Sequence, residues 1–171
     1  MTDQSRSITI LTADDDPDDC VLVEEAFRES GLNYDLFFVQ DGIKLLQYLR
    51  QQGSYVVPTS APRPDLILLD LNMPRKDGRE SLAEIKANPG LRSIPVVVLT
   101  ASNAEEDVLL TYDQGGAGFI IKPATFDGMV EVVKALNLYW FKIVELTSGE
   151  SGKNSGSDIS VMPSSGKSIS Q

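Results

Sequence analysis

The sequence has no histidine among its 171 residues and a single cysteine, Cys20. Without histidine the chain lacks the commonest general base and the commonest metal ligand of proteins, so its chemistry has to use Asp, Glu, Lys, Ser or Thr. One cysteine excludes an internal disulfide and fits a reducing compartment, and we therefore expect a cytoplasmic protein.

Basic charge and long apolar runs are also scarce. The formal net charge is −10, from 15 Lys and Arg against 25 Asp and Glu. Binding to a phosphate backbone requires clustered basic residues, and no such cluster is present, so we expect no nucleic-acid partner. No stretch is long and apolar enough to span a bilayer, and the first residues lack the apolar core of a signal peptide. We therefore expect no membrane partner either.

Short apolar runs alternate with helical patterns five times along the chain. The strands are expected at residues 8–13, 35–39, 66–70, 95–99 and 118–121. Helices are expected after each of them, beginning at Pro17, Ile43, Gly78, residue 104 and Phe126. This alternation predicts a doubly wound α/β fold with a five-stranded parallel sheet, although the periodicity leaves the strand order open.

Two segments depart from this alternation. Residues 51–64 hold three prolines and are expected to be an extended connection without regular structure. Residues 147–171 are dominated by Ser and Gly, which predicts a flexible tail behind a domain at 1–146. The last helix is expected to run from Phe126 to Leu146 and to extend past the sheet. The aromatic side chains on this extension predict a dimer or partner contact, and they are Tyr139, Trp140 and Phe141.

Chemistry-bearing residues stand at the ends of four expected strands. In a parallel sheet these ends share one edge, which would bring together Asp14 with Asp15, Asp70, Thr100 and Lys122. Clustered carboxylates repel one another unless a cation lies among them, and Mg²⁺ is the hard, oxygen-seeking ion that suits them. A metal, an amine and a hydroxyl around Asp70 would suit phosphoryl transfer to that carboxylate. Taken singly, each residue is at least as well explained by a structural role, as a helix cap, a turn residue, a strand-end hydroxyl or a solvated charge.

The residues at this edge resemble the receiver domain of two-component response regulators. The resemblance covers about residues 8–146, and it is carried by residues 12–17, 68–74, 77–78, 99–101 and 119–123. It implies a flavodoxin-like strand order, 2-1-3-4-5. It also implies that Asp70 accepts a phosphoryl group from the phosphohistidine of a sensor histidine kinase, with Mg²⁺ as the cofactor.

The same resemblance implies a role for each neighbour of Asp70. Asp14 and Asp15 would form an acid pair, and the metal would be held by Asp15, Asp70 and the backbone carbonyl of Asn72. Lys122 and Thr100 would contact the phosphoryl group, and Phe119 would be an aromatic that changes rotamer. The peptide bond between Lys122 and Pro123 would be cis. Many family members carry Tyr at the position of Phe119. Phe119 lacks that hydroxyl group, so the resemblance does not extend to any part of the rotamer switch that depends on it.

More narrowly, the long connection before residue 66 and the extension at 139–146 look like the single-domain regulators that partner bacterial phytochromes. This likeness implies a phytochrome-type kinase as partner and a protein that signals through contacts with other proteins. We also expect a homodimer through the last two helices and the fifth strand. Such a protein would not be an enzyme, beyond slow loss of its own phosphoryl group.

Three other functions are compatible with parts of the pattern. A Mg²⁺-dependent phosphohydrolase of the haloacid-dehalogenase type would carry a second acid two residues after Asp70, where this chain has Asn72. A flavodoxin-like cofactor binder would need a Gly- and Ser-rich loop after the first strand, whereas the carboxylates at 14–19 would repel a phosphate. A constitutive interaction module of the same fold, without phosphorylation, is a further alternative.

Overall fold

The computed structural model describes residues 7–56 and 61–142, with side chains up to residue 139. The chain divides into two compact units, Met1–Val130 and Glu131–Gln171. The first unit holds the whole sheet. Among the described residues, no helix is both long enough and apolar enough to cross a membrane.

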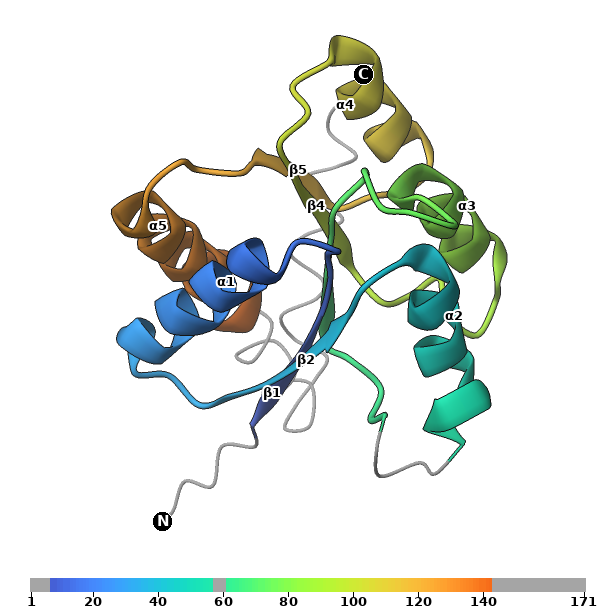
Figure 1. Cartoon of the computed structure of the whole chain (residues 1–171), viewed down its shortest axis with the longest axis horizontal. Coiled ribbons are helices and arrows are strands. Elements are labelled where there is room, and N and C mark those ends of the chain that lie inside the picture. Colours follow the sequence, from blue (N-terminus) through green and yellow to red (C-terminus); the bar gives the residue numbers. More distant parts are fainter. Residues whose placement is uncertain (1–6, 57–60, 143–171) are drawn as a thin grey trace, which may run out of the picture. The chain divides into compact units, whose positions relative to one another are not determined.

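Five parallel strands form one sheet in the order β2-β1-β3-β4-β5. Their bounds are β1 Ile8–Ala13, β2 Tyr34–Val39, β3 Leu66–Leu69, β4 Val96–Thr100 and β5 Gly118–Ile121. This is the flavodoxin-like order that the resemblance implied, and it confirms the predicted fold class. Because all strands are parallel, their carboxyl ends lie at the same edge of the sheet, as Figure 1 shows.

The helices follow the strands as predicted. They are α1 Pro17–Ser30, α2 Gly42–Arg50, α3 Gly78–Ala87, α4 Glu105–Asp113 and α5 Phe126–Leu136. Helix α1 begins where the sequence places it, because the Asp16 carboxylate accepts a hydrogen bond from the Asp18 amide and Pro17 occupies the first turn. It ends at Gly31, whose φ of 71° is a left-handed conformation that glycine adopts at little cost.

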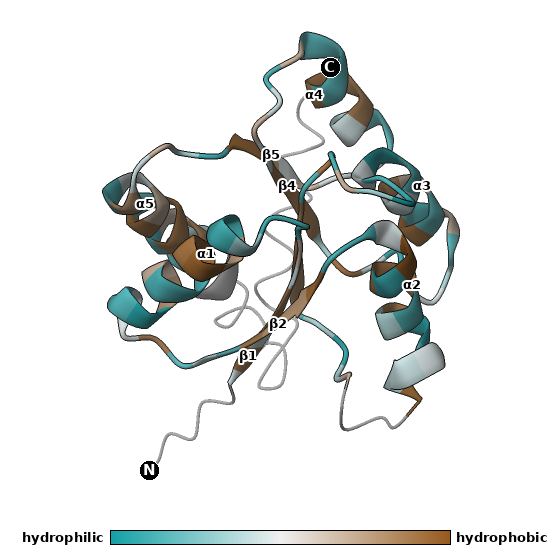
Figure 2. Cartoon of the chain, in the orientation of Figure 1, coloured by the Kyte–Doolittle hydropathy of each residue, from teal (hydrophilic) through white to brown (hydrophobic). Residues whose placement is uncertain are grey.

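The core lies on both faces of the central strands. Every residue of β3 and β4 is buried, as the continuous apolar runs predict. Alternate residues of β1 and β3, among them Leu11 and Ile67, join one apolar cluster with Leu45 of α2 and Leu82 of α3. Helices α2 and α3 therefore cover one face, and α1 covers the other (Figure 1). Figure 2 shows the apolar strands between helices whose outer faces are hydrophilic.

Two expectations about regular structure need correction. The prolines of residues 51–64 predict a segment without regular structure, but η1, a short 3₁₀ helix, spans Gly53–Tyr55. The pattern after Phe126 predicts a single α-helix to Leu146, whereas α5 ends at Leu136 and η3, a π-helix, spans Asn137–Lys142. Asn137 begins the change, and asparagine favours helical backbone only weakly because its side chain competes for backbone hydrogen bonds.

The rest of the expected extension lies outside the described residues. This applies to residues 143–146, to the tail at 147–171 and to the side chains of Trp140 and Phe141. The side chain of Tyr139 is described and is exposed. The domain boundary after residue 146 and the contact role of these aromatics therefore stay predictions.

Candidate phosphoacceptor site

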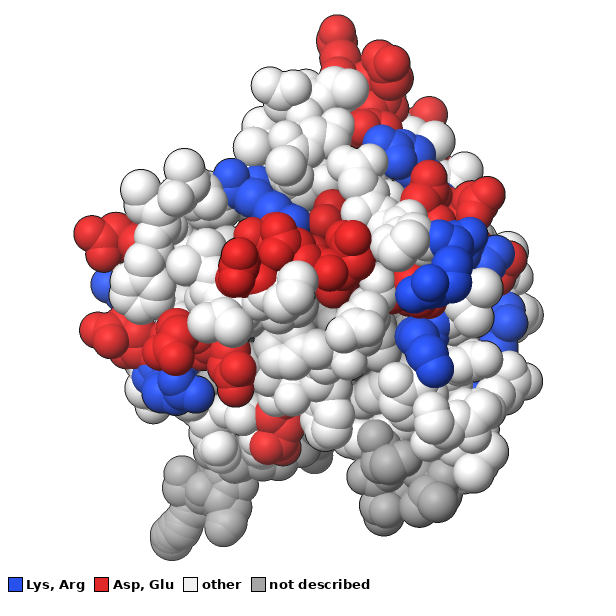
Figure 3. Space-filling model, in the orientation of Figure 1, with Lys and Arg blue, Asp and Glu red and all other residues white. Residues whose placement is uncertain are grey.

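The sheet brings the predicted residues to one edge through its backbone hydrogen bonds. The Asp14 amide donates to the Val39 carbonyl at 3.0 Å and the Asp70 amide donates to the Ala13 carbonyl at 3.0 Å. The Lys122 amide donates to the Thr100 carbonyl at 2.8 Å. Each side chain thus leaves the sheet directly after a strand, and Figure 3 shows the acidic side chains gathered over this edge.

The Lys122 ammonium lies among three carboxylates. Its Nζ is 2.8 Å from Asp14 Oδ2, 2.9 Å from Asp70 Oδ2 and 2.6 Å from Asp19 Oδ2. An ammonium has three N–H donors, so these contacts can use all of them. Burial alone would lower the pKa of Lys122, but its hydrogen bonds to the three carboxylates raise it overall, so Lys122 is a fixed positive charge at neutral pH.

Asp70 is buried and both of its oxygens are engaged. Oδ1 accepts a hydrogen bond from the Thr100 hydroxyl at 2.7 Å and one from the Asn72 amide at 3.2 Å, while Oδ2 accepts from Lys122. The hydroxyl of the fully buried Thr100 therefore already points at the predicted acceptor. An amine, a hydroxyl and an amide on one carboxylate are the donors that a phosphoryl group attached there would need.

Asp14, Asp15 and Asp70 form a cluster that suits a divalent cation. One carboxylate oxygen of each lies within 4.8 Å of the others. Asp14 is buried and Asp15 is exposed, so the cluster is open to solvent on one side. Burial raises the pKa of Asp14 to about 6 even though Lys122 and the Asp16 amide favour its charged form. A hard ion with oxygen ligands would stabilise the charged form of such a buried carboxylate beside two others, so the donor set fits a divalent cation.

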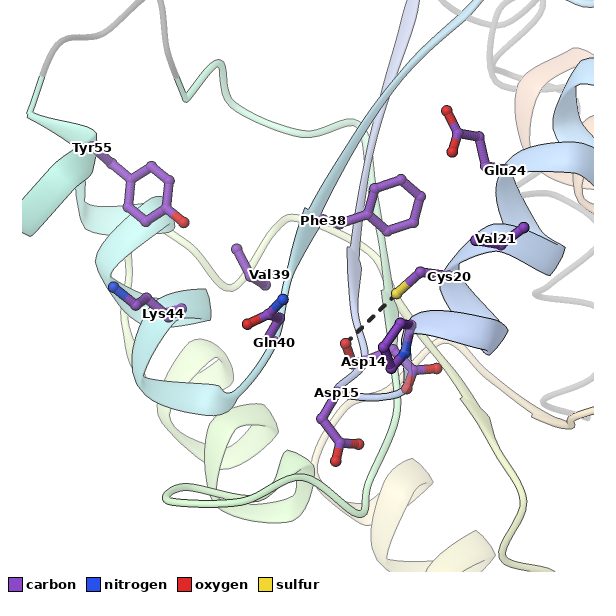
Figure 4. Close-up of a pocket in the computed structure, with 11 residues that line it drawn as sticks. Asp14, Asp15, Cys20, Val21, Glu24, Phe38, Val39, Gln40, Lys44 and Tyr55 are labelled. Carbon is purple, nitrogen blue, oxygen red and sulfur yellow. Dashed lines mark hydrogen bonds between the residues drawn. The ribbon is translucent and has the colours of Figure 1, made fainter.

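A pocket of about 430 Å³ borders the acid pair. Its lining includes residues of α1, β2, α2 and η1. Figure 4 shows Cys20 close to Asp14 and Phe38, with Lys44 and Tyr55 on the opposite side. The Cys20 thiol lies 3.7 Å from the Asp14 carbonyl oxygen. Burial, followed by the charge of Asp14, raises the pKa of Cys20 to about 12, so this thiol is not a nucleophile at neutral pH.

Gly78 fixes the loop that follows Asp70. Its amide donates to the Leu71 carbonyl at 2.8 Å, and a Cβ at this position would lie 2.7 Å from Leu71 Cα and closer still to the Asp70 carbonyl oxygen. Glycine is therefore required by the close approach of two backbone segments. Gly78, the first residue of α3, therefore constrains the packing of the loop that carries the predicted acceptor.

Phe119 and Pro123 lie on either side of Lys122 along the chain. Phe119 is half-buried in β5, and its role as a rotamer switch stays a prediction. The Lys122–Pro123 peptide bond is trans, so the expected cis bond is wrong. Trans is the intrinsic preference even before proline, by about 0.5–1 kcal/mol, and with this bond trans the Lys122 ammonium contacts all three carboxylates.

Sequence reasoning missed four residues beside the site. Asp19 is explained by the sequence only as a complement to the helix dipole, yet its carboxylate contacts Lys122. Its position one turn after Asp16 on a helix that starts at this edge is a signal that could have found it. Arg79 and Ser102 each donate a hydrogen bond to Asp107, and Arg79 also contacts Asn72. Arg79 is far from Ser102 and Asp107 along the chain, so no local sequence pattern pointed to them.

Comparisons with known proteins agree with this geometry. Residues 10–134 match the family model described as response regulator receiver domain. The chain is 41% identical over 147 residues to response regulator Rcp1 of Synechocystis sp., covering 85% of this chain and 98% of Rcp1.

Solved structures give the same result. The phosphorylated cyanobacterial phytochrome response regulator RcpA has a TM-score of 0.74 and 42% identity, covering 80% of this chain and 95% of RcpA. The Mn²⁺-bound form of Rcp1 has a TM-score of 0.70 and 41% identity, covering 78% of this chain and 94% of that structure. Because the family match spans well over half of the sequence and includes every residue at the sheet edge, the chain belongs to the response regulator receiver domain family, whose members act in two-component signalling.

Proposed function

We propose that Asp70 is the phosphoacceptor of this receiver domain and that its donor is the phosphohistidine of a sensor histidine kinase. The observation that carries the proposal is the set of donors on Asp70: Lys122 on one oxygen, and Thr100 with the Asn72 amide on the other. The absence of histidine from the chain fits, because the phosphohistidine then has to come from a partner.

Transfer to Asp70 follows from these contacts. A carboxylate oxygen of Asp70 attacks the phosphorus, an O–P bond forms as the P–N bond to the imidazole breaks, and the electron pair leaves with the imidazole. Lys122 neutralises a phosphoryl oxygen, and the Thr100 hydroxyl donates a hydrogen bond to the product. Attack frees one Asp70 oxygen from its present donors, so Lys122 or Thr100 moves from the carboxylate to the phosphoryl group.

A divalent ion, which we propose to be Mg²⁺, would neutralise charge on the phosphoryl oxygens when bound. Asp14, Asp15, Asp70 and the Asn72 carbonyl would hold it. The clustered carboxylates and the raised pKa of Asp14 support this donor set. The similar protein Rcp1 has been solved in a Mn²⁺-bound form, and the ligand preferences of Mn²⁺ resemble those of Mg²⁺, which supports the same chemistry.

We further propose a phytochrome-type kinase as the partner, because the similar structure of RcpA is that of a phytochrome response regulator. A homodimer through α4, β5 and the last helix is proposed as well. Exposed apolar side chains on the first two of these elements support it, and they are Leu109, Tyr112 and Ile121. The protein would signal through such contacts and hydrolyse its phosphoryl group only slowly. The cytoplasmic location stays a prediction.

Intact mass spectrometry tests the acceptor. With Mg²⁺ and acetyl phosphate, the wild type and an Asp113→Asn control, which removes an exposed carboxylate at the end of α4, should each gain one phosphoryl group. Asp70→Asn should gain none. A folded wild type without an adduct would favour the constitutive module, and rapid turnover of a phosphate ester would favour the phosphohydrolase.

The oligomeric state is tested by sedimentation at micromolar protein. Leu109→Glu places a charge on the exposed apolar surface of α4 and should reduce the mass in solution by half. A wild type that is already monomeric, before and after incubation with acetyl phosphate, would contradict the dimer.

A further inference from the structure

Six residues form a closed ring of hydrogen bonds that begins and ends at Asp70. Asp70 Oδ1 accepts from the Thr100 hydroxyl, whose oxygen lies 3.5 Å from the Ser102 amide. The Ser102 hydroxyl donates to Asp107 Oδ2 at 2.6 Å, and Asp107 is held by Arg79. Arg79 also reaches the Asn72 side-chain oxygen, and the Asn72 amide returns to Asp70 Oδ1.

The strongest link of the ring is the ion pair between Arg79 and Asp107. Arg79 Nε donates to Oδ1 at 2.7 Å and Nη2 donates to Oδ2 at 2.8 Å, which is the parallel two-bond geometry of a guanidinium and a carboxylate. Asp107 is buried in the first turn of α4, and Arg79 is in the first turn of α3. The pair therefore fixes the start of α4 to the start of α3.

The weak links of the ring lie next to Asp70. The contact of Arg79 Nη1 with Asn72 Oδ1 and that of the Ser102 amide with Thr100 Oγ1 are both 3.5 Å long. Hydrogen bonds of this length are weak, so these are the two links that can shorten when a ligand engages Asp70 or Asn72. A ligand that engages Asp70 Oδ1 or the Asn72 backbone therefore acts on both of these weak links at once.

We propose that Arg79 is a positioning residue, which holds the Asn72 loop, residues 70–77 between β3 and α3, in place for cation binding. It also transmits occupancy of the site to the start of α4 through Asp107. This inference rests on the proposed function, because it assigns the Asn72 carbonyl to the metal. It provides a connection from Asp70 to α4 that does not pass through Phe119. By reciprocity, whatever stabilises this position of α4 also tightens cation binding.

The simpler alternative is that Arg79 and Asp107 only tie two helices together. The two explanations predict opposite changes in Mg²⁺ affinity for the Arg79→Gln variant. Removal of a positive charge near a cation site by itself tightens binding, because repulsion is lost. Loss of a positioning residue instead loosens a ligand loop, and substitutions of residues that orient metal ligands weaken metal affinity by about tenfold or more.

The experiment measures Mg²⁺ affinity by titration calorimetry on the full chain without any phosphoryl donor. Arg79→Gln should bind Mg²⁺ about tenfold more weakly than wild type. Arg75→Gln is the matched control, because Arg75 is a cation of the same loop that pairs with Asp41 outside the ring. It should bind as tightly as wild type or slightly more tightly. Should Arg79→Gln fail to fold, Arg79→Lys keeps the charge, loses the two-bond geometry and should also bind more weakly.

A second measurement follows α4 directly by amide hydrogen exchange. Mg²⁺ should slow exchange at residues 105–108 by about fivefold in the wild type and have no such effect in Arg79→Gln. Affinity equal to or above that of wild type in Arg79→Gln, or exchange at α4 that ignores Mg²⁺ in the wild type, would overturn the inference. Neither measurement uses phosphorylation, so a wild type that binds Mg²⁺ but forms no adduct would refute the proposed function alone.

Discussion

Removing the metal should make the stability of this protein rise as the pH falls from 7 to 5. The cause is Asp14, whose pKa is raised by burial from 3.8 to about 6. A carboxyl with a higher pKa in the folded state binds its proton more tightly there than in the unfolded chain. Its contribution to stability is therefore complete below about pH 4 and is lost as the pH rises through 6.

The magnitude follows from the size of the shift. At about 1.36 kcal/mol per pKa unit, a rise from 3.8 to about 6 corresponds to about 3 kcal/mol in total. About 1 kcal/mol of this falls between pH 7 and 5. The chain has no histidine, so few other groups titrate in this window, and Asp14 should dominate it.

The assay is urea unfolding followed by far-ultraviolet circular dichroism at pH 5, 6 and 7, with EDTA or with Mg²⁺. In EDTA the free energy of unfolding should increase by about 1 kcal/mol from pH 7 to 5. Mg²⁺ should stabilise the protein at pH 7 and less so at pH 5, because it binds the ionised carboxylate. Asp14→Asn should remove the pH dependence and raise the stability of the metal-free protein at pH 7.

Two results would refute this reasoning. One is a metal-free stability that is constant or falls between pH 7 and 5, which would mean that Lys122 keeps Asp14 ionised. The other is an Asp14→Asn variant with the pH dependence of the wild type, which would place the titration at another group.

Three further substitutions test the geometry of the site. Gly78→Ala should lower the free energy of unfolding by about 2 kcal/mol, since its Cβ has no room against the Asp70 loop, whereas Gly118→Ala meets ordinary contacts and should be tolerated in urea melts. Asp19→Asn should change the rate of phosphorylation by acetyl phosphate, because the Asp19 carboxylate shares Lys122 with the acceptor. Asp18→Asn loses the same charge and should keep the wild-type rate. Equal rates for the wild type and both variants would contradict this role of Asp19. Asp41→Ala should cost at least about 1 kcal/mol in thermal melts, because it removes both the cap of α2 and the ion pair with Arg75, and an unchanged melting temperature would show that both contacts are dispensable.

The ring of hydrogen bonds between Asp70 and α4 predicts that cation binding and partner binding are coupled. If site occupancy reaches α4 through Arg79 and Asp107, then α4 contacts with a partner and cation binding strengthen each other. A dimer or partner complex formed through α4 should therefore show tighter Mg²⁺ binding than the free chain. A measurement of Mg²⁺ affinity in the free chain and in the complex therefore tests the proposed dimer and the proposed metal site together.

The sequence by itself determined the sheet and the centre of its site. Continuous apolar runs end at Asp70 and Thr100, and strands that alternate with helices have to be parallel, so their carboxyl ends meet at one edge. Local signals also determined the start of α1 at Asp16 and its end at Gly31, because caps act within one turn of the residues that they satisfy.

Only the tertiary structure decided which side chains complete that site. Asp19 reaches Lys122 across 103 positions of sequence, and Arg79 meets Asp107 across 28, so neither contact has a local pattern. The trans bond at Pro123 and the π-helix that begins at Asn137 were likewise not predicted from the sequence. Local periodicity fixes where an element runs and which way it faces, but the partner of a charged side chain depends on how elements distant in sequence are placed against one another.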